Sequence, residues 1–379
     1  MHSETDILII GGGIAGCIAA LALAPTFRVT LLDKQAAPTP KAGESLAPAA
    51  RRIFRELGLM ENNPDHETEQ LYRPSLGMQS YWGSKQLAVA DNLRNPDGFG
   101  YTLNRQAFEQ YLRDTVIHRG VHSIWPARWQ SSTYQANEWH ITAKSDNRDQ
   151  RQSYTLRAQL VIDATGRGAH FARSQGVTRQ AEDHLIACWG LVPNSIPSTL
   201  SSIAAHESGW WYSAVLPSEQ RLISFHTDAD LIDRAAFRAK EAFLNLAESD
   251  AVIGKLLPKD STSMDYQGIV SANSSRLAQV KGLRWLAIGD AAISFDPLSS
   301  QGMYHAMASA MQIRDLLLQH GGQRALAEQT LNVVLDRYED QIDQIWQRYL
   351  THKNLYYQQE NRWANAPFWQ RRHQQETAV

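Results

Sequence analysis

The chain has 379 residues, and its 37 lysines and arginines against 39 aspartates and glutamates leave a formal net charge of −2. That balance excludes broad electrostatic attraction to nucleic acid or to acidic lipid, so we expect no nucleic-acid partner. The two cysteines, Cys17 and Cys188, are too few for a disulfide framework, and no Cys/His pattern has metal-ligand spacing. The sequence therefore predicts an ordinary globular protein without a metal site.

The first residues of the chain do not resemble a targeting or anchoring segment. They contain no basic region and no small-residue cleavage site after a long apolar run. The apolar stretch 14–24 is shorter than the about 20 residues that a membrane-spanning helix needs. We therefore expect a soluble, cytoplasmic protein with no membrane partner.

The chain opens on a strand–helix–strand pattern. Residues 5–10 form a short apolar run that ends in glycines, which is typical of a buried parallel strand. Residues 14–24 are rich in alanine, leucine and isoleucine and predict a helix packed on a sheet. Residues 27–33 predict a second strand that ends in an acid. This βαβ order is typical of the start of a dinucleotide-binding fold.

The turn between the first strand and the helix fits the pattern GxGxxG, from Gly11 to Gly16. Gly11 allows the tight turn, Gly13 lets a pyrophosphate approach the backbone, and Gly16 permits close packing of helix on strand. The free N–H groups at this helix start, which includes Ile14 and Ala15, favour phosphate. The turn therefore predicts a phosphate-binding site.

At the end of the second strand, Asp33 is placed to bond a ribose hydroxyl, and the adjacent Lys34 is a further candidate contact. A GxGxxG alone is weak evidence, but here the strand, the helix, the second strand and the acid all agree. The fingerprint thus predicts a bound dinucleotide, although it does not distinguish FAD from NAD.

Nucleotide-type βα elements recur in the middle and at the end of the chain, with β-rich segments between them. Helices are predicted at 45–58, 104–118, 231–257, 300–319 and 322–357, and strands within 72–90, 137–163, 184–230 and 284–291. This order predicts an α/β fold with a discontinuous Rossmann-like nucleotide-binding domain, an inserted antiparallel-sheet substrate domain and a C-terminal helical segment. The expected boundaries are 1–71, 98–178 and 275–320 for the nucleotide domain, 72–97 and 179–274 for the substrate domain, and 321–379 for the helical segment.

Two later strands carry motifs that separate FAD from NAD. Residues 161–166 end in Ala-Thr-Gly, and residues 287–291 contain Gly-Asp after an apolar run. Both motifs resemble those of the FAD-dependent group that includes aromatic hydroxylases, flavin halogenases and geranylgeranyl-type reductases. The resemblance implies a glutathione-reductase-type, aromatic-hydroxylase-like domain that binds FAD. It places Asp163 and Gly166 at the cofactor, and Asp290 on its ribityl chain.

Two further segments match the same group. Arg105 matches its arginine near the FAD phosphates, and the alternative is a surface arginine on a helix. Residues 296–302, DPLSSQG, lead into a helix whose N-terminus the group places at the flavin N1/O2 edge, and the alternative is a plain proline loop and helix cap. That helix end carries partial positive charge, which would stabilise negative charge on reduced flavin. The residues implied to contact FAD here are Pro297, Ser300, Gln301, Gly302 and Met303.

No second dinucleotide fingerprint occurs in the sequence. Residues 166–168, GRG, lack the third glycine and the flanking pattern. We therefore expect no dedicated NAD(P)H domain. The reducing equivalents must come from transient NAD(P)H docking, from a separate reductase or from the substrate.

The segment 42–48, AGESLAP, indicates which members of this FAD-dependent group the chain resembles most. It resembles the Gly-Glu-Ser segment beside the flavin in halogenases, and more closely the Gly-Glu-Ser-Leu-x-Pro of the LodB/GoxB-like flavoprotein monooxygenases. Segments 209–217 and 225–230 and the aromatic tail are also similar to theirs, so the resemblance covers most of the chain. It implies hydroxylation, through a flavin C4a-hydroperoxide, of a tryptophan in a partner protein. That partner would be a quinoprotein amine or amino-acid oxidase precursor during tryptophylquinone (CTQ) biogenesis.

The chain departs from true halogenases in two places. Their Trp-x-Trp-x-Ile-Pro motif is absent, and the stretch 75–82 lacks the lysine that holds or forms the halogenating species. An unaligned lysine nearby, Lys85, leaves halogenation open. The alternatives are thus a halogenase or hydroxylase of a free small aromatic molecule, and a non-catalytic flavin-binding assembly factor.

Glu44 is the candidate catalytic residue. It lies beside Ser45 on the side expected to face the flavin and could accept a ring proton. It could equally be an acid at a helix N-terminus, favoured by the helix dipole. The aromatic residues of the tail are expected to pack onto the body, with a docking surface as the alternative. One or two aromatic residues of the predicted sheet should line the substrate cavity, from among Tyr81, Trp82, Trp210, Trp211 and Tyr212.

Overall fold

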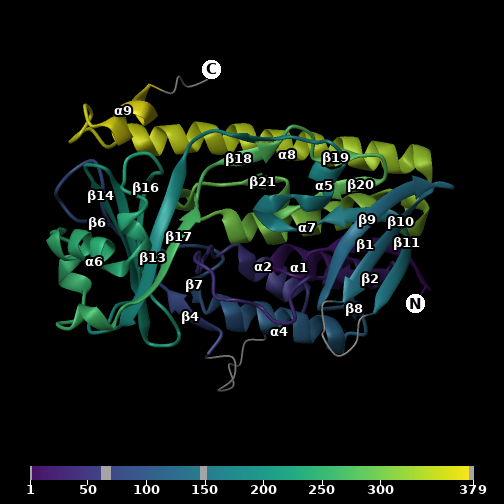
Figure 1. The fold of residues 1–379 in the computed structure, drawn as a ribbon, viewed down its shortest axis with the longest axis horizontal. Helices are drawn as coiled ribbons and strands as arrows, with labels where there is room; N and C mark the ends of the chain where they lie inside the picture. The colour runs from purple at the N-terminus through teal and green to yellow at the C-terminus, as the bar shows by residue number, and fades with distance from the viewer. Residues whose placement is uncertain (1, 61–69, 146–151, 375–379) are drawn as a thin grey trace.

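The computed structural model describes residues 2–60, 70–145 and 152–374. Figure 1 shows a mostly parallel sheet at the end of the molecule that holds the N-terminus, and a mostly antiparallel sheet at the other end. Helix α8 (Glu328–Gln358) runs along the top of both, because its 31 residues make it long enough to reach from one to the other.

The first sheet has the order β19-β20-β11-β1-β2-β8, and β10 and β9 continue antiparallel from β11. Its strands are β1 (His2–Ile10), β2 (Val29–Leu32), β8 (His122–Ile124), β9 (Ala127–Gln135), β10 (Glu138–Ser145), β11 (Ser153–Asp163), β19 (Lys281–Gly282) and β20 (Trp285–Ala287). Strand β1 pairs in parallel with β2 and β11, and Ile7, Leu8 and Ile9 are fully buried. This continuous burial is what a central parallel strand requires.

The helices around this sheet are α1 (Ile14–Leu23), α2 (Ala50–Glu56), α4 (Arg105–His118), α5 (His170–Ser174) and α7 (Gly302–Gln319). Helix α1 is apolar all round and buried along most of its length, since it packs against the sheet, α4 and α7. The strand–helix–strand opening predicted from the sequence is confirmed.

The second sheet has the order β17-β13-β16-β15-β14-β5-β6. Its strands are β5 (Gly77–Tyr81), β6 (Ala88–Asp91), β13 (Leu185–Pro193), β14 (Leu200–His206), β15 (Gly209–Val215), β16 (Gln220–Asp228) and β17 (Asp265–Ser271). One face packs against α6 (Lys240–Ser249), where Cys188, Trp211 and Phe225 lie against Phe243. Because side chains alternate along a strand, the next residues on β13, β15 and β16 face the opposite way.

Smaller elements complete the fold. Two three-stranded sheets are formed by β3 (Ser45–Leu46), β7 (Gly100–Leu103) and β4 (Tyr72–Ser75), and by β12 (Arg179–Ala181), β18 (Ser275–Leu277) and β21 (Ile293–Ser294). The short 3-10 helices are η1 (Gly166–Gly168), η2 (Ala236–Arg238), η3 (Gly254–Leu256), η4 (Ser261–Ser263), η5 (Gly289–Ala291), η6 (Pro297–Ser299) and η7 (Gly322–Leu326). The two sheets bring chain segments from different parts of the sequence to the same region.

The C-terminal tail folds back onto the second sheet. After α8 the chain turns into α9 (Pro367–His373), which lies beside that sheet in Figure 1. Tyr357, Phe368 and Trp369 are buried in one cluster with Trp210 of β15. Most of the tail's aromatic surface therefore packs onto the body, although Tyr356 is 58% exposed.

Three predicted elements differ from the structure. The helix expected at 231–257 is confined to α6, with the short helices η2 before it and η3 after it. The helix expected at 45–58 begins only at Ala50, and Ser45–Leu46 pairs as a strand with β7. Ala47 precedes Pro48, and a residue before proline is driven away from the helical conformation. The strand expected at 284–291 is short, because Gly289 has φ +56° and turns the chain into η5.

Candidate active site

A cavity of about 930 Å³ runs between the first sheet and the second. Gly11, Asp33, Ala164 and Ile288 follow β1, β2, β11 and β20, and all four line it. The cavity therefore opens at the carboxyl ends of the parallel strands, which is where open α/β sheets bind their ligands.

Most of the cofactor-binding residues expected from the sequence surround this cavity. They are Gly11, Gly13, Ile14, Ala15, Asp33, Lys34, Glu44, Ser45, Arg105, Gly166, Asp290, Pro297, Ser300, Gly302 and Met303. Gly16, Asp163 and Gln301 lie off its wall. Asp163 instead accepts hydrogen bonds from Thr165 and from the amide of Ala172, and so holds the loop after β11. Gln301 is the exposed N-cap residue of α7.

The glycine turn is shaped by close backbone contacts. Gly11 has φ +114°, and a Cβ there would lie 2.2 Å from the carbonyl oxygen of Ala164. A Cβ on Gly16 would lie 1.8 Å from the carbonyl oxygen of Gly11, whereas a Cβ on Gly13 would have no heavy atom within 4 Å. The first N–H groups of α1 have no side-chain cap, so they are available to an anion beside Gly13.

Asp33 is held by neighbours that the sequence did not reveal. Its carboxylate accepts hydrogen bonds from the amides of Gly12 and Gln35, each at 2.6 Å, and pairs with Arg113 at 3.0 Å. The buried Arg113 also donates to the carbonyl oxygens of Gly12 and Gln35. Arg113 thus fixes both the glycine turn and the end of β2. Its only sequence signal is its place on the same helix as Arg105.

Arg105 lies at the start of α4 because Asn104 caps that helix. Its guanidinium donates to the carbonyl oxygen of Gly43 at 2.6 Å and to Glu109 at 2.7 Å, and its buried Nε has no partner. Burial would raise the pKa of Glu109, but Arg105 and Lys41 outweigh it and hold that pKa below its ordinary value. Arg105, which lines the cavity, thus keeps one buried donor without a partner beside a charged carboxylate.

Glu44 links the two sides of the cavity. The hydroxyl of Tyr212, which comes from β15, lies close enough to its buried carboxyl to lower the pKa of that carboxyl. Burial raises the pKa of Glu44, and the Tyr212 hydroxyl, backbone amides and Arg105 oppose this only in part. Because α2 begins at Ala50, Glu44 is not in the first turn of a helix. The geometry therefore favours a carboxyl that can exchange a proton within the cavity.

The segment before α7 presents a second uncapped helix start. Ser300 adopts φ +50° between η6 and α7, and no side chain caps the N–H groups that begin at Gly302. Nearby, Asp290 pairs with Arg167 at 3.7 Å and keeps an exposed face toward the cavity. Open N–H groups at α1 and α7, space beside Gly13 and the unpartnered Nε of Arg105 together fit an anionic dinucleotide.

The second sheet forms the opposite wall. The side chains that it contributes include Ala187, Trp189, Trp210, Tyr212, Leu222, Ser224 and His226. Of the five aromatic candidates in the sequence, Trp210 and Tyr212 line the cavity, while Trp211 faces α6. Sequence reasoning missed Trp189 and His226, because their direction depends on strand register.

Within residues 2–60, 70–145 and 152–374, no cluster of histidine, cysteine, aspartate or glutamate side chains is arranged to hold a metal ion. Over the same residues, none of the helices combines the length and apolar character needed to cross a bilayer.

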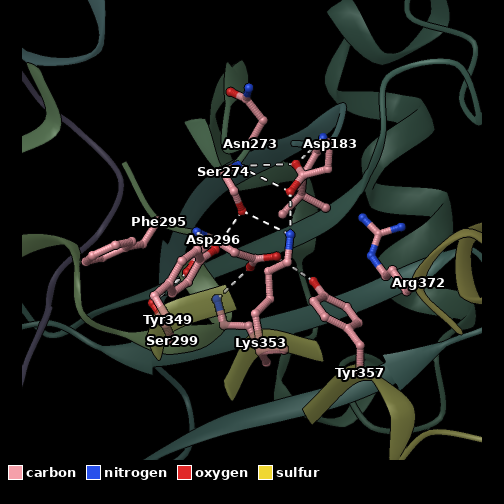
Figure 2. Close-up of polar contacts among 12 residues, drawn as sticks. Asp183, Asn273, Ser274, Phe295, Asp296, Ser299, Tyr349, Lys353, Tyr357 and Arg372 are labelled. Atoms are coloured by element: carbon pink, nitrogen blue, oxygen red, sulfur yellow. Dashed lines mark hydrogen bonds and ion pairs between the residues drawn. The ribbon is translucent and has the colours of Figure 1, made fainter. Parts of the chain in front are cut away.

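A buried polar cluster joins α8 to the segment that precedes α7 (Figure 2). The hydroxyl of Tyr357 donates to Asp296 at 2.7 Å and accepts from the indole N–H of Trp210 at 3.0 Å. The amide of Asp296 donates to the hydroxyl of Tyr349 at 2.8 Å. Burial raises the pKa of Asp296. Helix α8 thus holds the backbone that leads into the open end of α7.

Replacing Lys353 by methionine is expected to destabilise the protein by roughly 3–5 kcal/mol, because the change leaves a buried carboxylate without its cation. Lys353 lies 3.0 Å from Asp183 and 3.3 Å from the Ser274 hydroxyl in Figure 2, and its side chain is 4% exposed. Urea unfolding would measure the loss. Lys85→Met, at an exposed position, is the control. A K353M protein as stable as the unaltered chain would contradict this account, and K353M/D183N should recover part of the loss.

His305 on α7 is expected to make the protein less stable in mild acid. It is buried, its Nε2 has no partner, and burial lowers its pKa to about 4. An unfolded histidine titrates near pH 6.5. The contribution of His305 to the free energy of unfolding is therefore complete above about pH 6.5, and it falls by about 1.4 kcal/mol per pH unit between there and about pH 4. The free energy of unfolding of His305→Leu, measured with urea at several pH values, should depend on pH less steeply by that amount. The exposed control His352→Leu should keep the pH dependence of the unaltered protein. Equal slopes in H305L and the unaltered chain would rule this out.

Comparison with known proteins places the chain among flavoproteins. The model of the FAD binding domain family matches residues 4–352. LodB of Marinomonas mediterranea, named as an FAD-dependent oxidoreductase, is 28% identical over 372 residues, which cover 97% of this chain and 96% of LodB. A tryptophan 2-halogenase of Chondromyces crocatus is 26% identical over 338 residues, which cover 82% of this chain and 60% of the halogenase.

Solved structures share the fold. The flavin-dependent halogenase CmlS superposes with a TM-score of 0.82 at 22% identity, covering 98% of this chain and 68% of CmlS. The peptidyl tryptophan dihydroxylase QhpG superposes with a TM-score of 0.75 at 21% identity, covering 97% of this chain and 78% of QhpG. The expected fold, the LodB-like resemblance, FAD as cofactor and the class of FAD-dependent monooxygenase are confirmed. The chain belongs to the FAD binding domain family.

Proposed function

We propose that this protein hydroxylates a tryptophan side chain of a partner protein, during maturation of a tryptophylquinone cofactor in that partner. The observation that carries the proposal is the cavity wall on the second sheet, which is aromatic and neutral. Among the described residues, the lysines that line the cavity are Lys34 and Lys41, both on the nucleotide side. Lys85 is exposed and off the wall. The wall therefore lacks the amine that halogenation requires.

The similar proteins also favour hydroxylation of a protein tryptophan over halogenation. The similarity to LodB extends over nearly the full length of both chains, whereas the match to the tryptophan halogenase leaves much of that longer protein unmatched. QhpG, which shares the fold, acts on a peptidyl tryptophan and is essential for tryptophylquinone cofactor biogenesis. A protein-bound tryptophan is therefore the favoured substrate, and a quinoprotein oxidase precursor is the favoured partner.

The residues around the cavity suit FAD from end to end. The α1 start would hold its phosphates, Asp33 a ribose hydroxyl, Asp290 the ribityl chain and the α7 start the flavin edge. When bound and reduced, FAD supplies the electrons with which dioxygen is activated. The domain boundaries expected from the sequence, the cytoplasmic location, and NAD(P)H or a separate reductase as electron source remain predictions.

The protein positions the indole ring and accepts the proton that the ring releases. One oxygen atom of dioxygen replaces a hydrogen on an indole carbon, and the other leaves as water. Glu44 accepts the proton that the ring carbon releases, and the Tyr212 hydroxyl beside it favours the deprotonated form of the carboxyl.

A halogenase of a free aromatic molecule is the second candidate. The overlap with CmlS and the identity to the tryptophan halogenase favour it. The two candidates differ in the atom that the product gains.

The test uses the FAD-loaded protein, a flavin reductase with NADH, isotopically labelled dioxygen and an excess of bromide. The substrates, in parallel reactions, are N-acetyl-tryptophanamide as a stand-in for a protein tryptophan, and free indole. We expect a product that carries labelled oxygen and no bromine. A brominated product would replace the proposal with the halogenase, and labelled oxygen on free indole alone would replace it with a small-molecule hydroxylase.

A further inference from the structure

The cavity wall on the second sheet is ordered by strand register. Residues that pair across β13, β16 and β15 lie side by side on the same face. The two rows that face the cavity are Ala187, His226 and Trp210, and then Trp189, Ser224 and Tyr212. His226 and Trp189 therefore sit diagonally to each other on neighbouring strands. Both point into the cavity from a rigid part of the fold.

His226 brings a neutral imidazole to this wall. Its ring stacks on Trp210, with centroids 3.7 Å apart and planes within 5°. Nε2 lies 3.4 Å from the Ser224 hydroxyl, and the buried Nδ1 has no partner. Burial lowers the pKa of His226 to about 3, and the backbone of Trp210 opposes this only in part. The ring is therefore uncharged at neutral pH, and with Nε2–H directed at Ser224 its Nδ1 offers a lone pair.

Trp189 brings the opposite function to the same wall. Its indole N–H is buried without a partner, although its side chain lines the cavity. An indole nitrogen can only donate. By contrast, Trp210 in the neighbouring row donates to Tyr357, and the Tyr212 hydroxyl lies 3.4 Å from the hydroxyl of Ser201. The wall thus has one acceptor and one donor that no other described residue satisfies, and a buried polar group without a partner is costly unless a ligand completes it.

We propose that His226 and Trp189 recognise the indole of a tryptophan residue: Nδ1 of His226 accepts the indole N–H, and the N–H of Trp189 donates to a peptide carbonyl oxygen beside it. This inference rests on the proposed function and names the atoms of its substrate. It makes His226 a specificity residue for the ring nitrogen. It makes Trp189 a contact to the peptide that carries the ring.

The test compares two probes on the FAD-loaded protein by calorimetry. One is N-acetyl-tryptophanamide, and the other is its benzothienylalanine counterpart, in which sulfur replaces the ring N–H. A hydrogen bond to a buried acceptor should make the indole probe bind roughly tenfold to a hundredfold more tightly. His226→Phe keeps a ring stacked on Trp210 but removes the acceptor, so the ratio of the two dissociation constants should fall to near one.

Three further variants separate recognition from folding. His226→Asn places an amide oxygen near the position of Nδ1 and should retain part of the ratio. Trp189→Phe should weaken both probes alike, since both carry the same carbonyl groups, and so leave the ratio unchanged. His206→Phe is the matched control, because His206 bonds Ser208 and does not line the cavity.

The outcomes distinguish this inference from the proposed function. If the unaltered protein binds both probes equally, or if H226F keeps the full ratio, the role of His226 is overturned while a tryptophan substrate survives. If W189F changes the ratio but not the affinity for the benzothienyl probe, the role of Trp189 is overturned. If the unaltered protein binds neither probe, the proposed substrate falls, and this inference falls with it.

Discussion

Replacing Gly16 by alanine is expected to weaken FAD binding at least a hundredfold, which corresponds to roughly 3 kcal/mol or more. The new Cβ would lie 1.8 Å from the carbonyl oxygen of Gly11, and that oxygen belongs to the turn that presents the open N–H groups of α1. Backbone cannot give way as a side-chain tip can, so the turn must leave its position. Flavin absorbance per protein after reconstitution and gel filtration measures the loss.

Gly13→Ala is the matched variant for this experiment. A Cβ at Gly13 meets no protein atom within 4 Å, so this variant should fold normally and weaken FAD binding only by occupying the space of the cofactor. We therefore expect unchanged stability of the FAD-free protein for G13A and reduced stability for G16A. Stoichiometric, tight FAD binding by G16A would show that the phosphates do not sit on this turn.

Replacing Glu44 by glutamine is expected to lower turnover by about 10²- to 10⁴-fold, which is the usual contribution of a positioned general base. Glutamine keeps the size of the side chain beside Tyr212, but it cannot accept a proton. FAD content should stay unchanged. Single-turnover rates with the reduced protein measure the effect, and a rate within a factor of about three of the unaltered protein would assign Glu44 a structural role.

The pH profile gives a second test of the same carboxyl. Burial raises the pKa of Glu44, and the Tyr212 hydroxyl is among the groups that lower it again. A base works in its deprotonated form, so the rate should fall as the pH drops through that pKa. Tyr212→Phe removes the opposing hydrogen bond and should move this acid limb to higher pH. A limb that moves to lower pH, or stays in place, would argue that another group is titrating.

The part of the fold that could be predicted from sequence is the part with local signals. The strand–helix–strand opening shows an apolar run, a glycine turn and an apolar helix within one short stretch. Each of these signals can be read without knowing the rest of the fold. The strand Ser45–Leu46 has no such signal. It exists because β7, which is distant in the chain, pairs with it, and only tertiary structure brings the two together.

The candidate site divides in the same way. Gly11 and Asp33 could be placed because the spacing of the fingerprint reflects backbone geometry. Arg113 could not, since its pairing with Asp33 depends on how α4 crosses the sheet. His226 could not either, because β16 is buried on both faces and its pattern does not tell which face meets the cavity. Motifs thus predict the cofactor side of the cavity, and strand register decides which side chains of the second sheet face it.

The most direct test of the central claim is the intact mass of the protein that co-purifies with this chain, before and after exposure to a reductant and dioxygen. We predict a gain of one or two oxygen atoms, mapped by fragmentation to a single tryptophan, and lost when FAD is removed or when Glu44→Gln replaces the unaltered protein. A partner whose mass does not change, or one that gains a halogen, would contradict flavin-dependent hydroxylation of a protein tryptophan.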